Sequence, residues 1–490
     1  MAALRNILRS GRVAIALLAV AAPFCAAQEA YAPVERSRTM RLNSPFPLMF
    51  ELHRQTVGLA RLSSSWPAPC GGMPIAAPEC PEPGKLGWGA GRDRLSAKWI
   101  AGFEERLLED DVAEAFDVGA AVSGRKGAVS FWLDARVFSE IHSEEHPPSW
   151  DGEFVERQER GDDSRVDYVS YARYRGSFSV DLSWGRLAWR RDAPHWGPAY
   201  FHALVFNRDA APFDHFLYEG ELGPLRVVSM VGDLTIDGWG RWRKNRDTRT
   251  VYAHRYELSL HPSFTLGASE QLILYEDQAL WAAIPVVPLF MAKGQIDEDD
   301  NNGNISFDAQ WRALPGLRIY GEFLVDDMSE PTNLFNDFWK NRWAATVGAH
   351  AAWNAGAVPL GAIAEWTRIE PWVGTHYKAN TAQALNHGAP LGDQLGPNAM
   401  ALTARGYVRP GDWTLALTSD WSWKGADEGS SPEDVRDEND KSRKTFLHGA
   451  DVLWTISPEV VWTHGIFGSS ARFSWNRETT ELVLRMALEI

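Results

Sequence analysis

The sequence lacks a long hydrophobic run beyond its N-terminus. No later stretch of about 20 apolar residues occurs, which excludes a membrane-spanning helix from the mature part of the chain. The mean hydropathy of −0.30 is by itself typical of a soluble protein. A transmembrane β-barrel escapes such measures, because only every second residue of its strands faces lipid. The low mean hydropathy is therefore compatible with a transmembrane β-barrel.

Positive charge is also scarce. Lys and Arg number 49 against 64 Asp and Glu, and the formal net charge is −15. A field of this sign argues against binding nucleic acid or other polyanions through the protein as a whole, although local basic patches remain. We therefore expect no nucleic-acid partner.

The chain lacks the common motifs of catalysis and cofactor binding, including G-x-S-x-G, the P-loop and H-E-x-x-H. His142–His146 matches H-x-x-E-H, but Pro147 and Pro148 follow at once, where that motif needs a helix. Asp297–Asn304 is acidic like a calcium loop, yet no starting point places Gly at position six and Glu at position twelve. We expect no enzyme activity, no cofactor and no metal.

The N-terminus has the features of a secretory signal. Three arginines precede the apolar stretch Val13–Phe24, which is too short to span a bilayer, and small residues follow at Ala26 and Ala27. A lipoprotein signal at Cys25 is disfavoured by the bulky Phe24 before it. We predict a signal peptide over residues 1–27.

Cysteine is rare, and cleavage would leave only Cys70 and Cys80. An even count in an exported protein favours a disulfide between them, since export leads to an oxidising compartment. Two free thiols are the alternative, and a metal site is disfavoured because no His lies near.

Residues 28–111 differ in pattern from the rest of the chain. Apolar residues at helical spacing near the end of this region are Leu95, Trp99, Ile100, Phe103, Leu107 and Leu108. Asp93 before them suits a helix N-cap. We predict a small periplasmic helical subdomain over 28–111.

From Val112 onward apolar and polar residues alternate, most clearly in Thr479–Ile490. A period of two is typical of a strand with one apolar and one wetter face. Similar alternation occurs in Val129–Val137, Phe178–Trp184, Tyr252–Leu260, Leu317–Val325 and Trp413–Leu417. The residues of the last strand that we expect to face lipid are Leu482, Leu484, Met486, Leu488 and Ile490.

Strands of about ten residues with charges on the second face favour a polar lumen over a sandwich core. Short turns, among them Ser457–Glu459, alternate with long loops, as in outer-membrane barrels, while one outer connection near Gly468–Ser470 is short. Counting backward from a periplasmic C-terminus gives about 17 strands, so one more must precede Val112. We predict an all-β fold, a transmembrane antiparallel β-barrel of about 18 strands over 112–490.

Aromatic residues make up 12% of the chain, with 23 Trp, which suits membrane-interface girdles and also sugar binding. Aromatic rings stack on the apolar faces of sugars, and neighbouring arginines suit an acidic polysaccharide. The alternative is that these tryptophans belong to the outer girdle or pack loops over the barrel mouth. The predicted polysaccharide-binding residues in the loops are Trp150, Trp239, Arg241, Trp242, Arg243 and Trp372.

Several blocks resemble the capsule-assembly Wzi family. His195–Tyr200 is similar to the W-G-P-G block of that family, and Asn207–Phe213 to the polar stretch after it. Asn386–Gly392 resembles a later Gly/Pro-rich block, and Ser63–Pro67 an N-terminal S/T-T-W-P-L motif. The sequence departs from the family at Ala199, which replaces the second Gly, and in the Pro-rich insert that carries the two cysteines.

The resemblance implies a barrel of the bacterial outer membrane, in contact with its lipid, with a helical bundle at the periplasmic end. It implies a surface lectin that helps hold capsular polysaccharide or exopolysaccharide, without cofactor or catalysis. The family offers no residue motif for sugar contact, so the tryptophans above rest on their own chemistry. Two alternatives stay open: a passive porin-like channel and an outer-membrane hydrolase.

Overall fold

The computed structural model describes twelve stretches of the chain, two of them only two residues long. They are residues 65–66, 94–107, 112–143, 155–156, 166–235, 248–275, 279–290, 301–378, 381–436, 442–465, 467–476 and 479–489. The predicted signal peptide and both cysteines of the predicted disulfide lie outside the described residues. So does the predicted helical subdomain up to residue 93, apart from Ser65–Trp66.

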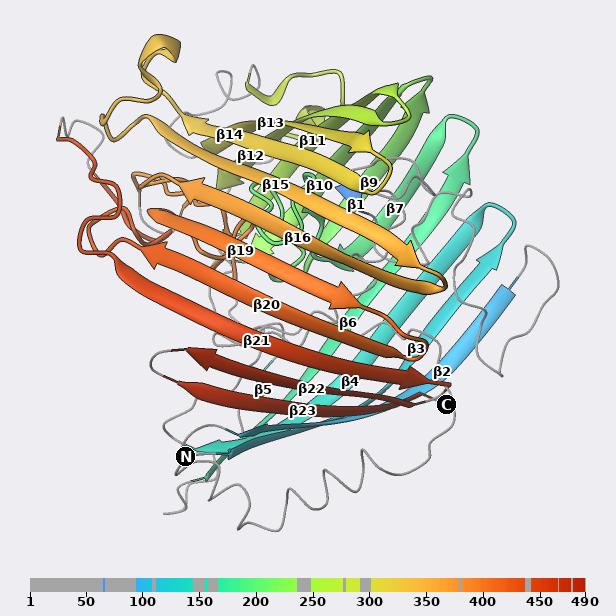
Figure 1. The fold of residues 1–490 in the computed structure, drawn as a ribbon. Coiled ribbons are helices and arrows are strands. Elements are labelled where there is room, and N and C mark those ends of the chain that lie inside the picture. Colours follow the sequence, from blue (N-terminus) through green and yellow to red (C-terminus); the bar gives the residue numbers. More distant parts are fainter. Residues whose placement is uncertain are drawn as a thin grey trace.

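Eighteen long strands among the described residues form one closed antiparallel barrel (Figure 1). Each pairs with the next along the chain, and β2 closes the ring on β23, with Ile100 opposite Glu489. The predicted all-β barrel and its strand number are confirmed. The strands are β2 Arg94–Leu107, β3 Val112–Lys126, β4 Val129–Ser143, β6 Val166–Leu182, β7 Gly185–Asp192, β9 Phe213–Leu222, β10 Leu225–Thr235, β11 Thr248–His261, β12 Phe264–Tyr275, β13 Asn301–Leu314, β14 Leu317–Asp327, β15 Arg342–Ala355, β16 Val358–Ile369, β19 Ala399–Val408, β20 Trp413–Lys424, β21 Asp451–His464, β22 Phe467–Asn476 and β23 Thr480–Glu489.

Shorter elements lie in the connections between these strands. The two-residue β5 pairs with β6, β1 pairs with β8, and β17 pairs with β18. Their bounds are β1 Ser65–Trp66, β5 Val155–Glu156, β8 His195–Trp196, β17 Leu385–Asn386 and β18 Ala389–Pro390, and two 3-10 helices are η1 Leu280–Ala283 and η3 Pro331–Asn333. No helix among the described residues is both long and apolar enough to cross a membrane.

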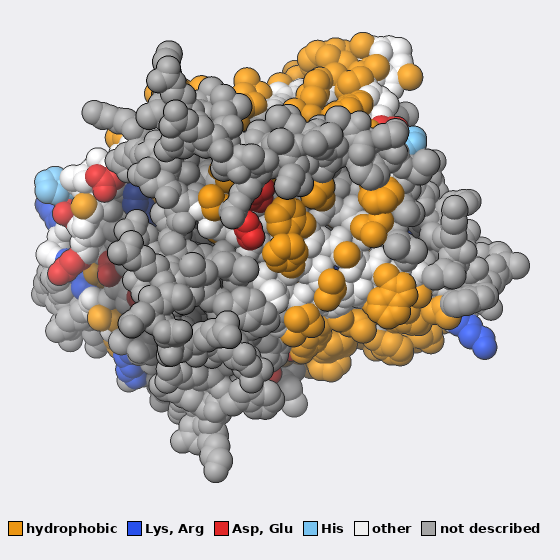
Figure 2. Space-filling view, turned by 90° about the horizontal axis from the view of Figure 1, so that it is seen from below, with side chains coloured by type: hydrophobic (Ala, Val, Ile, Leu, Met, Phe, Trp, Pro, Cys, Tyr) orange, Lys and Arg blue, Asp and Glu red, His pale blue; other side chains and the backbone are white. Residues whose placement is uncertain are grey.

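The period-two pattern separates a lumenal face from an outer face. In β23, Glu481, Val483 and Arg485 are buried toward the lumen, whereas the alternate Met486 is 38% exposed, so the predicted facing is confirmed for the described residues. Hydrophobic side chains gather on the outer surface (Figure 2). Large exposed ones on the strands include Phe116, Val118, Leu133, Val137, Phe178, Leu187, Phe216, Phe307, Val347 and Leu402.

An apolar outer wall around a closed barrel needs a bilayer as its surroundings, since water would leave that surface uncovered. The chain therefore is a transmembrane barrel of the bacterial outer membrane, as predicted. The connections at the end that holds the C-terminal strand end are short, and the long loops lie at the other end, which we call the outer end.

The predicted helix before residue 108 is wrong, because Arg94–Leu107 forms strand β2. Leu95, Trp99, Phe103 and Leu107 are four residues apart, a spacing that shares one face in a helix and also in a strand. β2 is the additional strand that the count required. The barrel therefore includes β2 and begins before Val112, the predicted domain boundary.

The predicted turn at Ser457–Glu459 is also wrong, because β21 continues through it to His464. Pro458 gave a turn signal, but a proline is tolerated in a strand where the ladder is interrupted. The pairing of β21 with β22 does skip from Ile456 to Glu459. The short turn instead follows His464, and Gly468–Ser470 lies within β22.

Candidate functional site: a plug in the lumen

The connection between β7 and β9, residues 193–212, folds into the barrel. Most of its residues are buried, including Tyr200, Ala203 and Phe206 at 0% exposed. Its polar groups bond to side chains on the lumenal faces of β14, β15, β16 and β19. We call residues 193–212, together with the described part of loop 370–398, the lumenal plug.

Glu365 of β16 holds the centre of the plug. Its carboxylate accepts hydrogen bonds from the backbone N–H of Tyr200, from that of Phe201 at 2.9 Å and from that of His202 at 3.1 Å. The hydroxyl of Tyr320 donates a further bond at 2.6 Å. One buried carboxylate thus pairs three consecutive backbone donors that would otherwise lack partners.

Glu322 of β14 explains why a glycine stands at position 197. Gly197 has φ 106°, a left-handed value that disfavours other residues, and a Cβ there would lie 2.4 Å from the Glu322 carboxylate. The same carboxylate accepts from the N–H of Leu204 at 3.3 Å and from the hydroxyl of Ser306 at 3.2 Å. Ala199, the departure from the family block, is accommodated in a small cluster with Tyr320.

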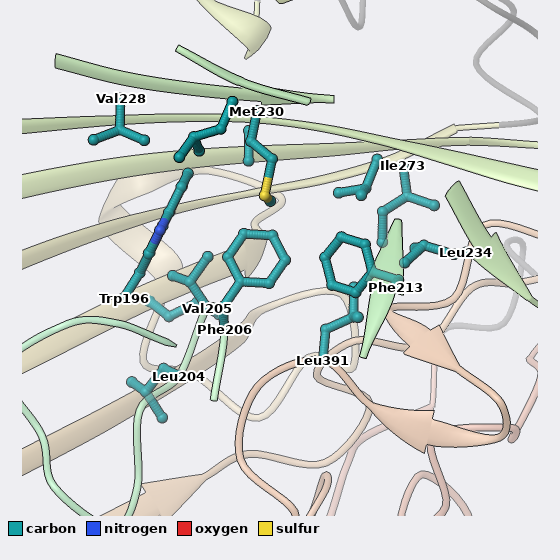
Figure 3. Packing of buried hydrophobic residues seen from close by; sticks show 14 of the residues in the cluster. Trp196, Leu204, Val205, Phe206, Phe213, Val228, Met230, Leu234, Ile273 and Leu391 are labelled. Atoms are coloured by element: carbon teal, nitrogen blue, oxygen red, sulfur yellow. The ribbon is translucent and has the colours of Figure 1, made fainter. Parts of the chain in front are cut away.

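Apolar side chains fill the space between the plug and the wall (Figure 3). Trp196 and Phe206 pack edge to face, with ring centroids 5.0 Å apart. Inward-facing residues of β10–β12 cover them from the wall side, and Leu391 contributes from the second loop. Burial of this kind gives the plug a core of its own, which fixes one arrangement.

The second loop, 370–398, is tied to the first and to the outer ends of the strands. The N–H of Asn207 donates to Leu391 O at 2.8 Å, and the Asn386 amide donates to Ala211 O at 3.1 Å. Gly392 approaches Leu204 so closely that a Cβ would lie 2.0 Å from its carbonyl oxygen, so glycine is required there.

His202 clasps the two loops together. Its Nδ1 lies 2.7 Å from the Asp393 carboxylate, and its Nε2 lies 2.9 Å from the hydroxyl of Thr403 on β19. Burial opposes the charged ring, but the carboxylates of Asp393 and Glu365 outweigh it and raise the pKa of His202 to about 9. The clasp is therefore an ion pair at neutral pH.

His195 is in the opposite state. Burial, aided by the nearby Arg208 guanidinium, lowers its pKa to about 3, so the ring is neutral. Its Nε2 lies 2.8 Å from the carbonyl oxygen of Ala199 and donates a hydrogen bond to it. This bond closes the His195–Tyr200 turn.

The blocks that carried the family resemblance meet at this plug. Ser65–Trp66 forms strand β1 and pairs with His195–Trp196, so the N-terminal block adds a strand to the plug. The Asn207–Phe213 and Asn386–Gly392 blocks supply the cross-links between the two loops. Their common place in the fold was not visible from their separation in sequence.

A cavity of about 50 Å³ lies between the plug and the wall. Polar groups at its edge include Gln271, Asn304, Asp326 and Asp393, beside Leu204 and Gly392. Its volume suits a few water molecules, which could satisfy the Asn304 Oδ1 and Gln271 Nε2 atoms that have no partner in the described structure. It is too small for a sugar ring.

Ion pairs line the lumenal wall. Arg255 bonds Asp308 at 2.8 Å and Glu257 at 3.0 Å, and Arg405 bonds Glu459 at 2.6 Å. Groups of three or more His, Cys, Asp or Glu arranged to hold a metal ion are not found in the described part of the chain. The charged side chains named here form ion pairs with one another.

Of the predicted polysaccharide-binding residues, only Trp372 is described, and it is buried at 1% exposed. Its ring packs against Trp339 at 6.0 Å and under the Arg436 guanidinium at 5.0 Å. This is the packing alternative that the sequence left open, because the ring has no face free for a sugar. The other five, Trp150, Trp239, Arg241, Trp242 and Arg243, lie outside the described residues.

Sequence reasoning missed the anchors of the plug, Glu365 and Glu322. Each is an acidic residue at a lumenal position of a strand, and many other strands carry such residues. The available signal was the Gly-Pro block itself, whose backbone donors need buried acceptors.

In comparisons with known proteins, no family model matches the chain, and no curated protein matches it in sequence. Solved structures resemble it in fold. One is Wzi of Escherichia coli, described as an outer-membrane protein involved in group 1 capsule assembly and as a carbohydrate-binding β-barrel, with a TM-score of 0.51, 14% identity, and coverage of 80% of this chain and 84% of that chain.

Two others are from Pseudomonas aeruginosa. OccK5 has a TM-score of 0.43 and 12% identity, and the match covers 82% of this chain and 99% of that chain. OprD has a TM-score of 0.41 and 10% identity, and the match covers 81% and 95%. At these identities the likeness concerns the fold alone, that of an outer-membrane barrel.

Proposed function

We propose that this protein is a surface lectin of the outer membrane that holds capsular polysaccharide or exopolysaccharide at the cell surface. The observation that carries the proposal is the lumenal plug. Its two loops are bonded to the wall and to each other beside β9–β19, which suits a platform for outer loops better than a path for solutes. The fold likeness to Wzi, itself described as carbohydrate-binding, supports the same function.

The loop between β10 and β11 is the first candidate for sugar contact. Its sequence places Trp239 and Trp242 beside Arg241 and Arg243. Stacking on the tryptophans and charge pairing with the arginines together suit an acidic polysaccharide. Trp150, in the sequence between β4 and β6, is a second candidate. Trp372 contributes by packing the mouth.

The test measures binding of the cell's own purified surface polysaccharide to the full-length mature protein in detergent. We expect saturable binding that weakens with salt, because exposed charges are screened over about 8–10 Å at physiological strength. Changing Trp239 and Trp242 together to Ala should weaken binding and release polymer from cells. Trp184→Ala is the matched control, since Trp184 is 60% exposed in a turn at the opposite end.

If the folded protein binds no polymer at any salt concentration, the lectin function is wrong. If it binds but the double variant binds equally well, the function stands and the contact lies in another loop. Release of shortened polymer during the binding assay would instead favour the outer-membrane hydrolase.

A further inference from the structure

The connection between β12 and β13 also leaves the outer end of the barrel, but residues 279–290 fold back over the outside of the wall. We call them the outer-wall segment. Neighbouring residues of β11 and β12 point to opposite faces of the wall, and their contacts show that the segment covers the outer face. Val251, Ala253 and Ile273 pack in the core shared with the plug, whereas their chain neighbours Tyr252, Leu272 and Leu274 pack against the segment.

Polar side chains on the outer face bond to the backbone of this segment. The Ser229 hydroxyl donates to Ala283 O at 2.6 Å, and the Tyr256 hydroxyl donates to Pro285 O at 2.6 Å. The N–H of Ala279 donates to the Tyr252 hydroxyl at 3.0 Å. The Glu270 carboxylate accepts from the N–H of Leu289. These bonds satisfy part of an irregular backbone from the protein side, so that fewer of its polar groups need water at membrane depth.

The outward side of the segment is apolar. Val286 is 82% exposed, Phe290 66%, Ile284 49% and Trp281 40%. The side chains that bond to its backbone lie underneath, on β10–β12, and the large side chains on the exposed side are apolar. In water this would be an unusual outer loop, because a cluster of large apolar side chains would stay uncovered.

The segment lies within the lipid-facing belt of the wall. Glu270, which it covers, is near the middle of the twelve-residue β12. On one side, Val231 beneath the segment pairs with Phe216 of β9, which is 68% exposed. On the other side, Ala268 next to the covered strip pairs with Phe307 of β13, which is 52% exposed. Lipid-facing aromatic residues therefore lie on both sides of the outer-wall segment, at the same level along the barrel axis.

We propose that the outer-wall segment is embedded in the outer leaflet, and that its exposed side is a binding surface for the hydrocarbon chains of outer-leaflet lipid. The occupant is lipid rather than a second protein, because the apolar face continues the lipid-facing wall on both sides. The segment thus anchors the barrel laterally and shields Ser229, Tyr256 and Glu270 from lipid. This goes beyond the proposed lectin function and does not depend on it.

The test places a fluorescent bimane label at single cysteines in the full mature chain, with Cys70 and Cys80 replaced by Ser, and reconstitutes the protein in vesicles. Val286→Cys reports on the segment. Phe216→Cys is the lipid-facing control. Thr332→Cys is the aqueous control, since Thr332 is exposed in the outer loop between β14 and β15. Quenching by nitroxide carried on lipid chains is compared with quenching by iodide in the buffer.

We expect the label at position 286 to match position 216, with lipid quenching within about twofold and several times that at position 332, and with weak iodide quenching. The proposal is overturned if position 286 follows position 332. It is also overturned if position 286 is shielded from both quenchers in a manner that depends on protein density in the vesicles, because a second copy would then be the occupant.

Discussion

Two loops leave the same end of this barrel and fold in opposite directions. Residues 193–212 enter the lumen, and residues 279–290 lie on the outer wall. Both are held through their backbones by side chains of barrel strands, Glu365 and Glu322 inside the lumen and Glu270 on the outer wall. The strands therefore decide where a loop goes by the face on which they carry polar groups. The wall strands β10–β12 lie between the two loops, and both of their faces are covered by other parts of the chain.

The largest expected effect on either loop comes from removing Glu365, which holds residues 193–212. Glu365→Ala would leave the three backbone donors and the Tyr320 hydroxyl unpaired, and we expect a loss of about 4 kcal/mol in the free energy of unfolding. Urea unfolding of the refolded barrel measures it. Glu221→Ala, at an exposed position of β9, is the control and should change stability little. Equal effects of the two variants would contradict the anchoring role.

The assignment of the two faces can be tested on one strand. Leu484→Arg places a charge in lipid and should cost roughly 2–4 kcal/mol if the site is near the midplane. Arg485→Leu, on the lumenal side, should cost less. Folding into bilayers of defined composition measures both. Equal and negligible effects of the two variants would contradict this assignment of the faces of β23.

Glu270 has the corresponding role for the outer-wall segment. Glu270→Ala removes the acceptor for Leu289 and should cost about 2 kcal/mol, since one buried donor loses its partner. Hydrogen exchange measured by mass spectrometry should rise in residues 279–290 and stay unchanged in 193–212. Glu365→Ala should give the reverse pattern. If both variants loosen both loops, the two loops are not independent.

The smallest effect concerns pH. His202 has a pKa of about 9 in the folded protein, above its ordinary value of 6.5. Its contribution is therefore fully present below about pH 6.5 and is lost as pH rises through 9. After division by the intrinsic exchange rate, which itself rises with pH, the protection of residues 193–212 should fall over that window. The fall should be smaller than the one Glu270→Ala causes in residues 279–290, because the neutral ring still forms hydrogen bonds. His202→Gln should abolish the dependence, and a dependence that persists would assign it to another group.

The fold was largely predictable from sequence because barrel strands alternate strictly. Alternation does not identify β2, because the spacing of its apolar residues fits a helix and a strand equally well. These residues are Leu95, Trp99, Phe103 and Leu107. Only the closing partner, β23, decides between them, and pairing across such a separation leaves no local signal. In β11 the alternation was right, but it could not reveal that Tyr252 faces another part of the chain instead of lipid.

The plug was less predictable than the barrel. The Gly-Pro blocks marked the right segments, since Gly197 and Gly392 are needed where backbones meet a carboxylate or a carbonyl. Their partners could not be chosen, because Glu365 is one of many lumenal acids. Trp372 shows the same limit: a loop tryptophan beside polar residues suits a sugar or a packed mouth, and only its burial distinguishes them.

Ion conductance in planar bilayers tests most directly whether this barrel is a closed platform. With the full mature chain, we predict no steady conductance, and intermittent openings only when Glu365→Ala loosens the plug. Steady conductance of the unmodified protein, unchanged by Glu365→Ala, would contradict the account and favour the porin-like channel.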